Sequence, residues 1–318
     1  MAPATTTQRG EPEVEDIPEL DLSHSREDEF LQAVREGCQE IGCFRIVNHG
    51  ISPDLIRKAD LASREAFKLP LETKKKNVSP NPFMGYVGGI PEAPFYESLG
   101  IELAGAPDRE AVKDFSHIMW PQGNQFFSET MEEFTCEMME MSKKVHQVIL
   151  ASLGVGKYYA SDFDHGKALF RMNMYEVPSE LPSESYGLGP HKDGTSISIL
   201  YGDGSSGLQV LKAGNWVDVK PVPNTFVAMA GDTFQAWTNG RIRSTKHRVM
   251  LKKQQSRLSL GLFGISPNEM IIKTPPELID DAHPQRDKSY KFEDMVTHRA
   301  GEGRLLEEPL EAFVGISM

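Results

Sequence analysis

Two potential metal ligands, His191 and Asp193, stand two positions apart in the segment GPHKDG. In an extended strand, side chains at positions i and i+2 point to the same side, so this imidazole and carboxylate can reach one point while Lys192 faces away. Short H-x-D patterns are common, however, and the triplet taken alone favours an ordinary polar turn over a metal site. The rest of the chain has to supply a third ligand.

That third ligand is available at His247, which begins the strand pattern HRVML about fifty residues later. Taken alone, a histidine between Lys246 and Arg248 would be a surface residue at the end of a basic strand. Strands this far apart in sequence can nevertheless face each other in a jelly roll. Two histidines and one carboxylate on one face of an octahedron leave three positions open, as in non-haem Fe(II) oxygenases. Zinc is the alternative, and it would usually complete a tetrahedral site with water.

A potential anion site follows in QSRLSLGLF, where Arg257 and Ser259 share one strand face. A lone arginine in a strand is normally a solvated charge, but a guanidinium beside a hydroxyl can hold a carboxylate through paired hydrogen bonds. Such a pair could hold a dicarboxylate co-substrate near the metal. Asn173 and Tyr175 in FRMNMYE have the same i, i+2 spacing and could donate hydrogen bonds to the same ligand.

Short strands that could position these residues begin near Ala168. The segments are LFRMNMY, SISILYG, GLQVL, NWVDVKP, TFVAMAG, HRVML and RLSLGLFGI, separated by Gly, Asn, Asp or Pro. A spacing of about eight to twelve residues between such segments is typical of an antiparallel sandwich or barrel. We therefore predict an α+β fold in which N-terminal helices buttress a jelly-roll core, that is, a cupin-like double-stranded β-helix.

The first half of the chain has helical spacing instead. Apolar residues recur every three to four positions over about 25–42, 53–67 and 127–154. We expect a flexible tail over residues 1–16 and one continuous unit over 17–318. Within that unit we expect a mainly helical part (17–160), the jelly-roll core with the metal site (161–275) and a C-terminal helical segment (276–318).

The passage NPFMGYVGGIPEAPFYESLG, rich in glycine, proline and aromatic residues, suits an irregular loop. Its aromatic side chains Phe83, Tyr86, Phe95 and Tyr96 could line a substrate cavity or only cover the edge of the core, and the pattern favours neither. His49 ends a short strand at NHG, and we interpret it as structural rather than as a ligand.

Composition limits the partners. The chain has 318 residues, of which 39% are hydrophobic and 25% charged, as is typical of a globular protein with a substantial core. Its net charge of −12 disfavours nucleic acid and anionic membrane surfaces. No apolar run reaches the length of a membrane span, no secretory signal is evident, and the three cysteines form no CxxC pair. We expect a cytoplasmic monomer that binds a small molecule and neither nucleic acid nor membrane.

Together, the motifs resemble those of the plant-type Fe(II)- and 2-oxoglutarate-dependent dioxygenases. The matching pieces span nearly the whole chain: GCFRIVNHG, FRMNMYE, the two histidines and aspartate, TNGR, and the R-x-S pair. The segments GYVGGIPEAPFYESLGI, MWPQGN and AWTNGRIRSTKHRVM are similar to the branch that contains glucosinolate side-chain and auxin-oxidising dioxygenases. Lys192 departs from the pattern, because the family commonly has a small polar residue between the two ligands.

The resemblance implies a reaction and a set of residue roles. The reaction would require Fe(II), 2-oxoglutarate and O2, with ascorbate as a reductant. The substrate would be a small plant metabolite, either a specialised product or a hormone. It would be hydroxylated, desaturated or dealkylated with release of succinate and CO2. The implied iron ligands are His191, Asp193 and His247. The implied 2-oxoglutarate residues are Arg257, Ser259, Tyr175 and Asn173. Phe263 would stack against the substrate, or it is a core phenylalanine.

Two other functions remain consistent with the residues. One is a non-haem iron oxidase of the same scaffold that consumes O2 without 2-oxoglutarate, which measurements of succinate and O2 with and without 2-oxoglutarate would distinguish. The other is a non-catalytic metal-binding jelly-roll protein, which would have no need of Arg257.

Overall fold

The computed structural model describes residues 17–23, 27–81, 84–164, 167–181, 185–252, 256–301 and 309–315. The predicted tail, residues 1–16, and the predicted pocket residue Phe83 lie outside these ranges. Among the helices in this part of the chain, none combines the length and apolar character needed to cross a bilayer.

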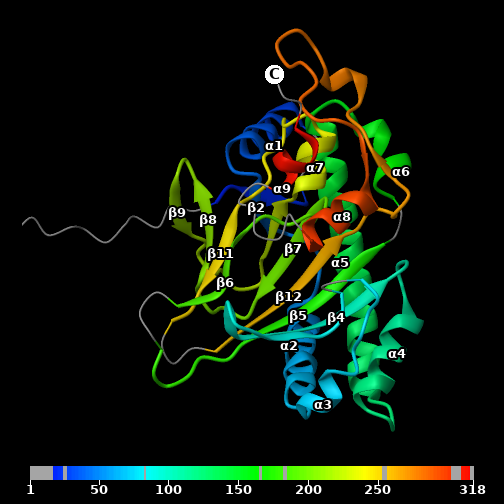
Figure 1. The fold of residues 1–318 in the computed structure, drawn as a ribbon, viewed down its shortest axis with the longest axis vertical. Helices are drawn as coiled ribbons and strands as arrows, with labels where there is room; N and C mark the ends of the chain where they lie inside the picture. The colour runs from blue at the N-terminus through cyan, green and yellow to red at the C-terminus, as the bar shows by residue number, and fades with distance from the viewer. Residues whose placement is uncertain are drawn as a thin grey trace, which may run out of the picture.

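Two β-sheets face each other in the core (Figure 1). All their pairings are antiparallel except that of β1 with β2. The large sheet has the order β1 (Glu19–Asp21), β2 (Cys43–Val47), β10 (Phe226–Ala230), β7 (Ile197–Gly202), β12 (Arg257–Gly264), β5 (Ala168–Tyr175), β4 (Ala93–Leu103) and β3 (Val87–Ile90). The small sheet has the order β6 (Tyr186–His191), β11 (His247–Met250), β8 (Leu208–Lys212) and β9 (Asn215–Asp218). The predicted α+β fold with a jelly-roll core is confirmed.

Helices cover the outer face of the large sheet. Figure 1 shows α2 (Pro53–Phe67) and α5 (Gln125–Ser152) along this face, while the small sheet lies on the other side. Alternation along LFRMNMY explains the arrangement, because Phe170 and Met172 join the helix-side core while the polar residues between them face the small sheet. The remaining helices are α1 (Asp28–Glu40), α3 (Leu71–Lys74), α4 (Arg109–Met119), α6 (Tyr159–Asp162), α7 (Asp232–Trp237), α8 (Phe292–Ala300) and α9 (Pro309–Val314).

The long helix α5 forms as the apolar stripe predicts. The side chain of Asn124 caps it by accepting a hydrogen bond from the backbone N–H of Phe127 at 3.0 Å. Three of its methionines, Met131, Met138 and Met141, are buried in the core, which is the packing role that their spacing indicates. The helix ends at Ser152, just before Gly154 adopts a φ of 72°.

The prediction of an irregular loop over the glycine-rich aromatic passage was wrong, because this passage forms the hairpin of β3 and β4. Strand β4 pairs with β5 from Tyr96 opposite Tyr175 to Leu103 opposite Ala168, so it satisfies the outer hydrogen-bonding edge of β5. Gly100 lets the segment at Met84 lie against β4, since a Cβ there would lie 2.0 Å from the carbonyl oxygen of Met84. The first half of the chain therefore supplies four strands of the large sheet as well as helices.

His49 is structural, as expected. Its Nδ1 accepts a hydrogen bond from the backbone N–H of Ile51 at 3.1 Å, and its Nε2 lies 3.0 Å from the carbonyl oxygen of Asn224, to which it donates. Both ring nitrogens thus form hydrogen bonds, one within the turn that follows β2 and one to the turn that precedes β10.

Candidate active site

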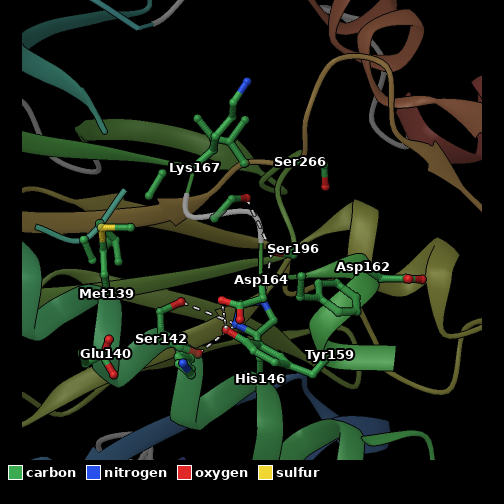
Figure 2. Close-up of a pocket in the computed structure, with 17 residues that line it drawn as sticks. Met139, Glu140, Ser142, His146, Tyr159, Asp162, Asp164, Lys167, Ser196 and Ser266 are labelled. Carbon is green, nitrogen blue, oxygen red and sulfur yellow. Dashed lines mark hydrogen bonds between the residues drawn. The ribbon is translucent and has the colours of Figure 1, made fainter. Parts of the chain in front are cut away.

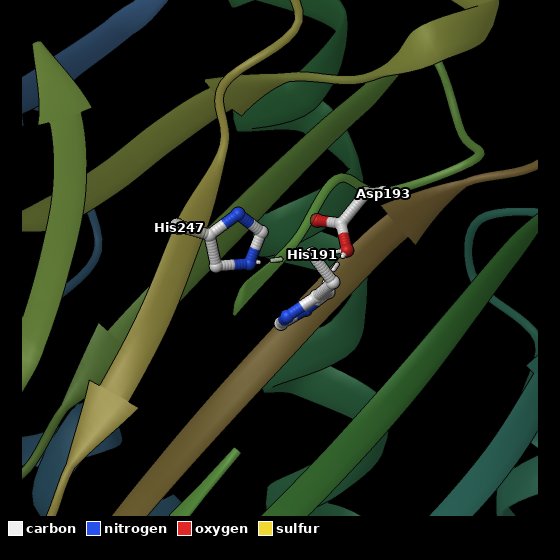
Figure 3. Close-up of side chains that lie close together, drawn as sticks. All are labelled: His191, Asp193 and His247. Carbon is white, nitrogen blue, oxygen red and sulfur yellow. Dashed lines mark ion pairs between the residues drawn. The ribbon is translucent and has the colours of Figure 1, made fainter. Parts of the chain in front are cut away.

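The two histidines and the aspartate meet between the sheets (Figure 3). His191 is the last residue of β6 and His247 the first of β11, and the two are direct cross-strand partners. Asp193 Oδ1 lies 3.7 Å from Nε2 of His191 and 4.0 Å from Nε2 of His247. One potential ligand atom from each of the three side chains lies within 4.8 Å of the others. Such a separation suits three groups that share one ion.

Backbone carbonyl groups orient both imidazoles. Nδ1 of His191 lies 2.8 Å from the carbonyl oxygen of Gly189, and Nδ1 of His247 lies 3.0 Å from that of Thr245. A carbonyl oxygen can only accept a hydrogen bond, so each Nδ1 carries the proton and each Nε2 keeps its lone pair free for a metal. The donor set therefore fits a divalent transition metal.

Electrostatics favour the protonation states that a metal needs. Burial and the neighbouring His247 lower the pKa of His191 to about 4, so its ring is neutral at neutral pH. Burial alone would raise the pKa of Asp193, but His247, His191 and a hydrogen bond from Ser198 hold it below the ordinary value. The Ser198 hydroxyl donates to Oδ2 of Asp193 at 2.5 Å, which leaves Oδ1 facing the histidines.

The expectation that Asp193 lies in the same strand as His191 was wrong, because β6 ends at His191 and Asp193 lies in the following turn. The start of α7 holds this turn: the backbone N–H of Asp232 donates to the carbonyl oxygen of Asp193, and that of Gly231 to the carbonyl oxygen of Ser196, both at 2.8 Å. Gly231 is required here, since a Cβ would lie 2.2 Å from the carbonyl oxygen of Thr195. The two ligands converge through a supported turn, not through strand alternation.

The predicted anion residues lie together on the inner face of the large sheet. Arg257 pairs with Tyr175, and Ser259 pairs with Asn173, across β12 and β5. The guanidinium carbon of Arg257 lies 5.5 Å from the centroid of the Tyr175 ring. The Nε of Arg257 is buried with no hydrogen-bond partner among the described residues. Arg257 also forms no ion pair with them, so it is a buried cation without a counter-charge among the described residues.

Sequence reasoning missed another buried cation of the inner face, Arg171. It lies two residues before Asn173 and opposite Gly261 of β12, on the same inner face. Its Nε donates to Oγ of Ser98 at 2.7 Å and its Nη2 to the carbonyl oxygen of Gly85 at 3.2 Å. Only 6% of the residue is exposed, and burial lowers its pKa. Among the described residues it too forms no ion pair. The signal was present in FRMNMY, where the alternation that selects Asn173 also selects Arg171.

The structure places the predicted substrate residues differently from one another. Phe263 is half-buried on the inner face, and its ring lies 2.8 Å from the point where a Cβ on Gly261 would stand. Tyr96 is buried and donates from its hydroxyl to Oδ1 of Asn173 at 2.8 Å, so it orients a predicted co-substrate residue. Tyr86 packs on the helix-side core and donates to Glu97 at 2.9 Å, and its contact with a substrate stays a prediction.

The larger of two cavities in the described part of the chain does not contain the predicted site residues. Figure 2 shows a cavity of about 260 Å³ between α5, α6 and the end of β12, and none of the predicted site residues is among the described residues that line it. His146 lies in its wall, with Nδ1 2.8 Å from the carbonyl oxygen of Ser142 and Nε2 3.1 Å from Oγ of Ser196. A smaller cavity of about 40 Å³ is lined by Arg257 between the sheets. Neither cavity is lined by the three potential ligands, so we place the active site by the side chains themselves, where His191, Asp193 and His247 meet between the sheets.

Comparison with known proteins decides the family. The 2OG-Fe(II) oxygenase superfamily matches residues 166–265, and the N-terminal region of non-haem dioxygenases in morphine synthesis matches residues 17–95. The probable 2-oxoglutarate-dependent dioxygenase AOP1.2 of Arabidopsis thaliana is 34% identical over 311 residues, which cover 93% of this chain and 95% of that protein. The chain belongs to the 2OG-Fe(II) oxygenase superfamily. As predicted, it is an oxidoreductase of the Fe(II)- and 2-oxoglutarate-dependent dioxygenase class.

Solved structures of other superfamily members agree with this assignment. The crystal structure of the rice dioxygenase for auxin oxidation has a TM-score of 0.82 and 30% identity, and the match covers 94% of this chain and all of that one. The structure of JOX2 in complex with 2OG, Fe and JA has a TM-score of 0.81 and 27% identity, covering 95% of this chain and 90% of that one. These matches confirm the predicted resemblance to dioxygenases near the AOP and auxin-oxidising branches, and they favour 2-oxoglutarate dependence over both alternative functions.

Proposed function

We propose that this dioxygenase oxidises a small metabolite that carries a carboxylate, and that Arg171 binds this carboxylate. The observation that supports the proposal most strongly is the buried Arg171 guanidinium, which has no ion-pair partner among the described residues. Leaving a charge buried without a partner is unfavourable, and proteins retain such groups where a ligand supplies the opposite charge.

The other site residues have separate tasks in this proposal. His191, Asp193 and His247 hold Fe(II), which when bound activates O2 for oxidation of the substrate and of 2-oxoglutarate. Arg257 and Ser259 bind the far carboxylate of 2-oxoglutarate through a planar fork and a hydroxyl. Asn173 has its carbonyl oxygen occupied by the Tyr96 hydroxyl, so its amide N–H groups are left to donate to the co-substrate.

Arg257 and Arg171 lie at different positions along the pairing of β5 with β12. Arg257 pairs with Tyr175 at one end of β12, whereas Arg171 pairs with Gly261, four residues further along. Phe263 follows Gly261 on the same face, so a substrate anchored at Arg171 can pack its apolar part against the Phe263 ring. The names of related proteins are consistent with a carboxylate, since one structural relative is named for auxin oxidation and another contains JA.

Succinate formation from 2-oxoglutarate tests this proposal. A set of small plant acids, each paired with its methyl ester, is screened for compounds that stimulate it. We expect an acid to be turned over while its methyl ester is not. Arg171→Met should raise the KM for that acid about tenfold or more, since a hydrogen bond to a charged group contributes about 1.5–3 kcal/mol. Arg171→Lys, which keeps the charge, should recover part of the affinity. Equal turnover of acid and ester would contradict the carboxylate assignment.

We further propose that the enzyme acts in the cytoplasm as a monomer, without nucleic acid or membrane partners, and that ascorbate serves as its reductant. The acidic net charge of −12 supports the exclusion of nucleic acid and anionic membranes. Size-exclusion chromatography with light scattering tests the monomer, which elution at twice the chain mass of 35.5 kDa would refute.

A further inference from the structure

The turn that carries Asp193 is contacted from behind by the C-terminal part of the chain. Figure 1 shows α7, α8 and α9 grouped near one end of β7 and β12. Arg299, in the last turn of α8, donates from Nη2 to the carbonyl oxygen of Lys192 at 2.5 Å. Lys192 is the residue between the two ligands, so a side chain about one hundred positions away binds the backbone of the metal-binding segment directly.

The same guanidinium joins this segment to α7. Nη1 of Arg299 donates to Oδ2 of Asp232 at 2.6 Å, and the Asp232 side chain is completely buried. The backbone N–H of Asp232 donates in turn to the carbonyl oxygen of Asp193. Arg299 therefore fixes the residue before Asp193 directly and the carbonyl group of Asp193 through Asp232.

The packing around the turn is adapted to Arg299. A Cβ on Gly194 would lie 3.0 Å from Nε of Arg299 and 3.1 Å from its Cδ, so residue 194 leaves room for the arginine stem. The Thr233 hydroxyl donates to the carbonyl oxygen of Gly194 at 2.7 Å. With Arg299 in place, three consecutive carbonyl groups of the segment, those of Lys192, Asp193 and Gly194, are each bound by a donor outside it.

We infer that Arg299 is a positioning residue for the iron site, which holds the Asp193 turn in the conformation that brings its carboxylate to the two histidines. This inference rests on the proposed iron site. Three side chains can share one ion only if the turn presents Oδ1 of Asp193 toward both Nε2 atoms. Asp193 lies outside β6, so no strand pairing fixes the turn, and contacts from other segments have to hold it. Loss of Arg299 should therefore weaken metal binding even in molecules that remain folded.

The alternative is that Arg299 only neutralises the buried Asp232. Both roles predict that Arg299→Met lowers Tm, because the variant would remove the ion pair of a completely buried carboxylate. The double variant Arg299→Met with Asp232→Asn removes that charge. It should recover much of the Tm, but it cannot restore the hydrogen bond to the Lys192 carbonyl group.

The test is an anaerobic calorimetric titration of the full metal-free chain with Fe(II), with Tm measured in parallel. We expect the double variant to bind Fe(II) at least about tenfold more weakly than wild type, the loss of one charge-assisted hydrogen bond. Arg299→Lys should lie between the two. Arg241→Met is the matched control, since Arg241 also donates to a carboxylate and a carbonyl group, those of Asp280 and Leu278, which lie outside the metal-binding segment. Its affinity should equal that of wild type.

Wild-type Fe(II) affinity in the double variant would overturn the inference and leave Arg299 with the charge-neutralising role alone. Failure of the wild-type chain to bind Fe(II) is a different result, because it would refute the proposed iron site itself. Should the double variant not fold, Arg299→Lys decides: its terminal ammonium can reach the carboxylate or the carbonyl group but has no fork to hold both, so unchanged Fe(II) affinity in this variant would also overturn the inference.

Discussion

Replacing Arg257 by methionine should weaken 2-oxoglutarate binding without unfolding the protein. Methionine keeps most of the apolar stem that packs over Tyr175 and removes the fork. Arg257 forms no ion pair among the described residues, so its removal leaves no buried carboxylate there without a partner. A charge-assisted hydrogen bond contributes about 1.5–3 kcal/mol, which corresponds to roughly a 10- to 150-fold rise in the KM for 2-oxoglutarate.

Succinate formation at varied 2-oxoglutarate concentration measures this effect, and the melting temperature controls for folding. Arg257→Lys keeps the charge but not the planar pair of donors, so its KM should rise about tenfold and not recover fully. Arg57→Lys on the exposed face of α2 is the control and should behave as wild type, since Arg57 is 62% exposed and pairs only with Asp54 among the described residues. An unchanged KM in Arg257→Met would refute the assignment of the co-substrate site.

Two further outcomes follow from other parts of the structure. Phe263→Ala should raise the KM of the substrate about tenfold, because burying an aromatic side chain contributes about 1.5–3 kcal/mol, while substrate-independent succinate formation stays at the wild-type rate; a parallel loss of both activities would contradict a substrate contact. Burial lowers the pKa of His146 to about 4 from an ordinary 6.5, so the folded protein holds this ring neutral. The resulting contribution to the free energy of unfolding, on the order of 3 kcal/mol, is fully present above pH 6.5 and is lost as the pH falls toward 4. His146→Gln should therefore flatten the fall of Tm between pH 7 and 5, and an unaltered Tm profile would show that His146 is not the titrating group.

The strands of the jelly roll could be predicted from the sequence because their periodicity is local. Each of the segments from LFRMNMY to RLSLGLFGI forms a strand, and the alternation that buries Phe170 and Met172 also turns Asn173 and Tyr175 inward. The three candidate ligands could be selected for a related reason, since few residue types bind iron, and the structure brings one potential ligand atom of each within 4.8 Å of the others.

The remaining features depend on contacts between distant segments. The hairpin of β3 and β4 forms because β5 offers it a partner edge, which the local composition of glycine and proline does not reveal. Arg171 is distinguished from a solvated strand arginine only by residues of the neighbouring strands, Gly100 and Gly261 opposite it and Ser98, which accepts its hydrogen bond. Arg299 is joined to the metal-binding segment by a contact that no local pattern encodes. Tertiary pairing, not propensity, determines these three features.

The most direct test of the central claim is an anaerobic titration of the metal-free chain with Fe(II) in the presence of 2-oxoglutarate. We predict one Fe(II) per chain and a weak visible charge-transfer band that saturates at this ratio. His247→Ala should lose the band because it removes one of the three ligands on which the site depends. Saturation at wild-type affinity in this variant, or no band in the wild-type chain, would contradict the account.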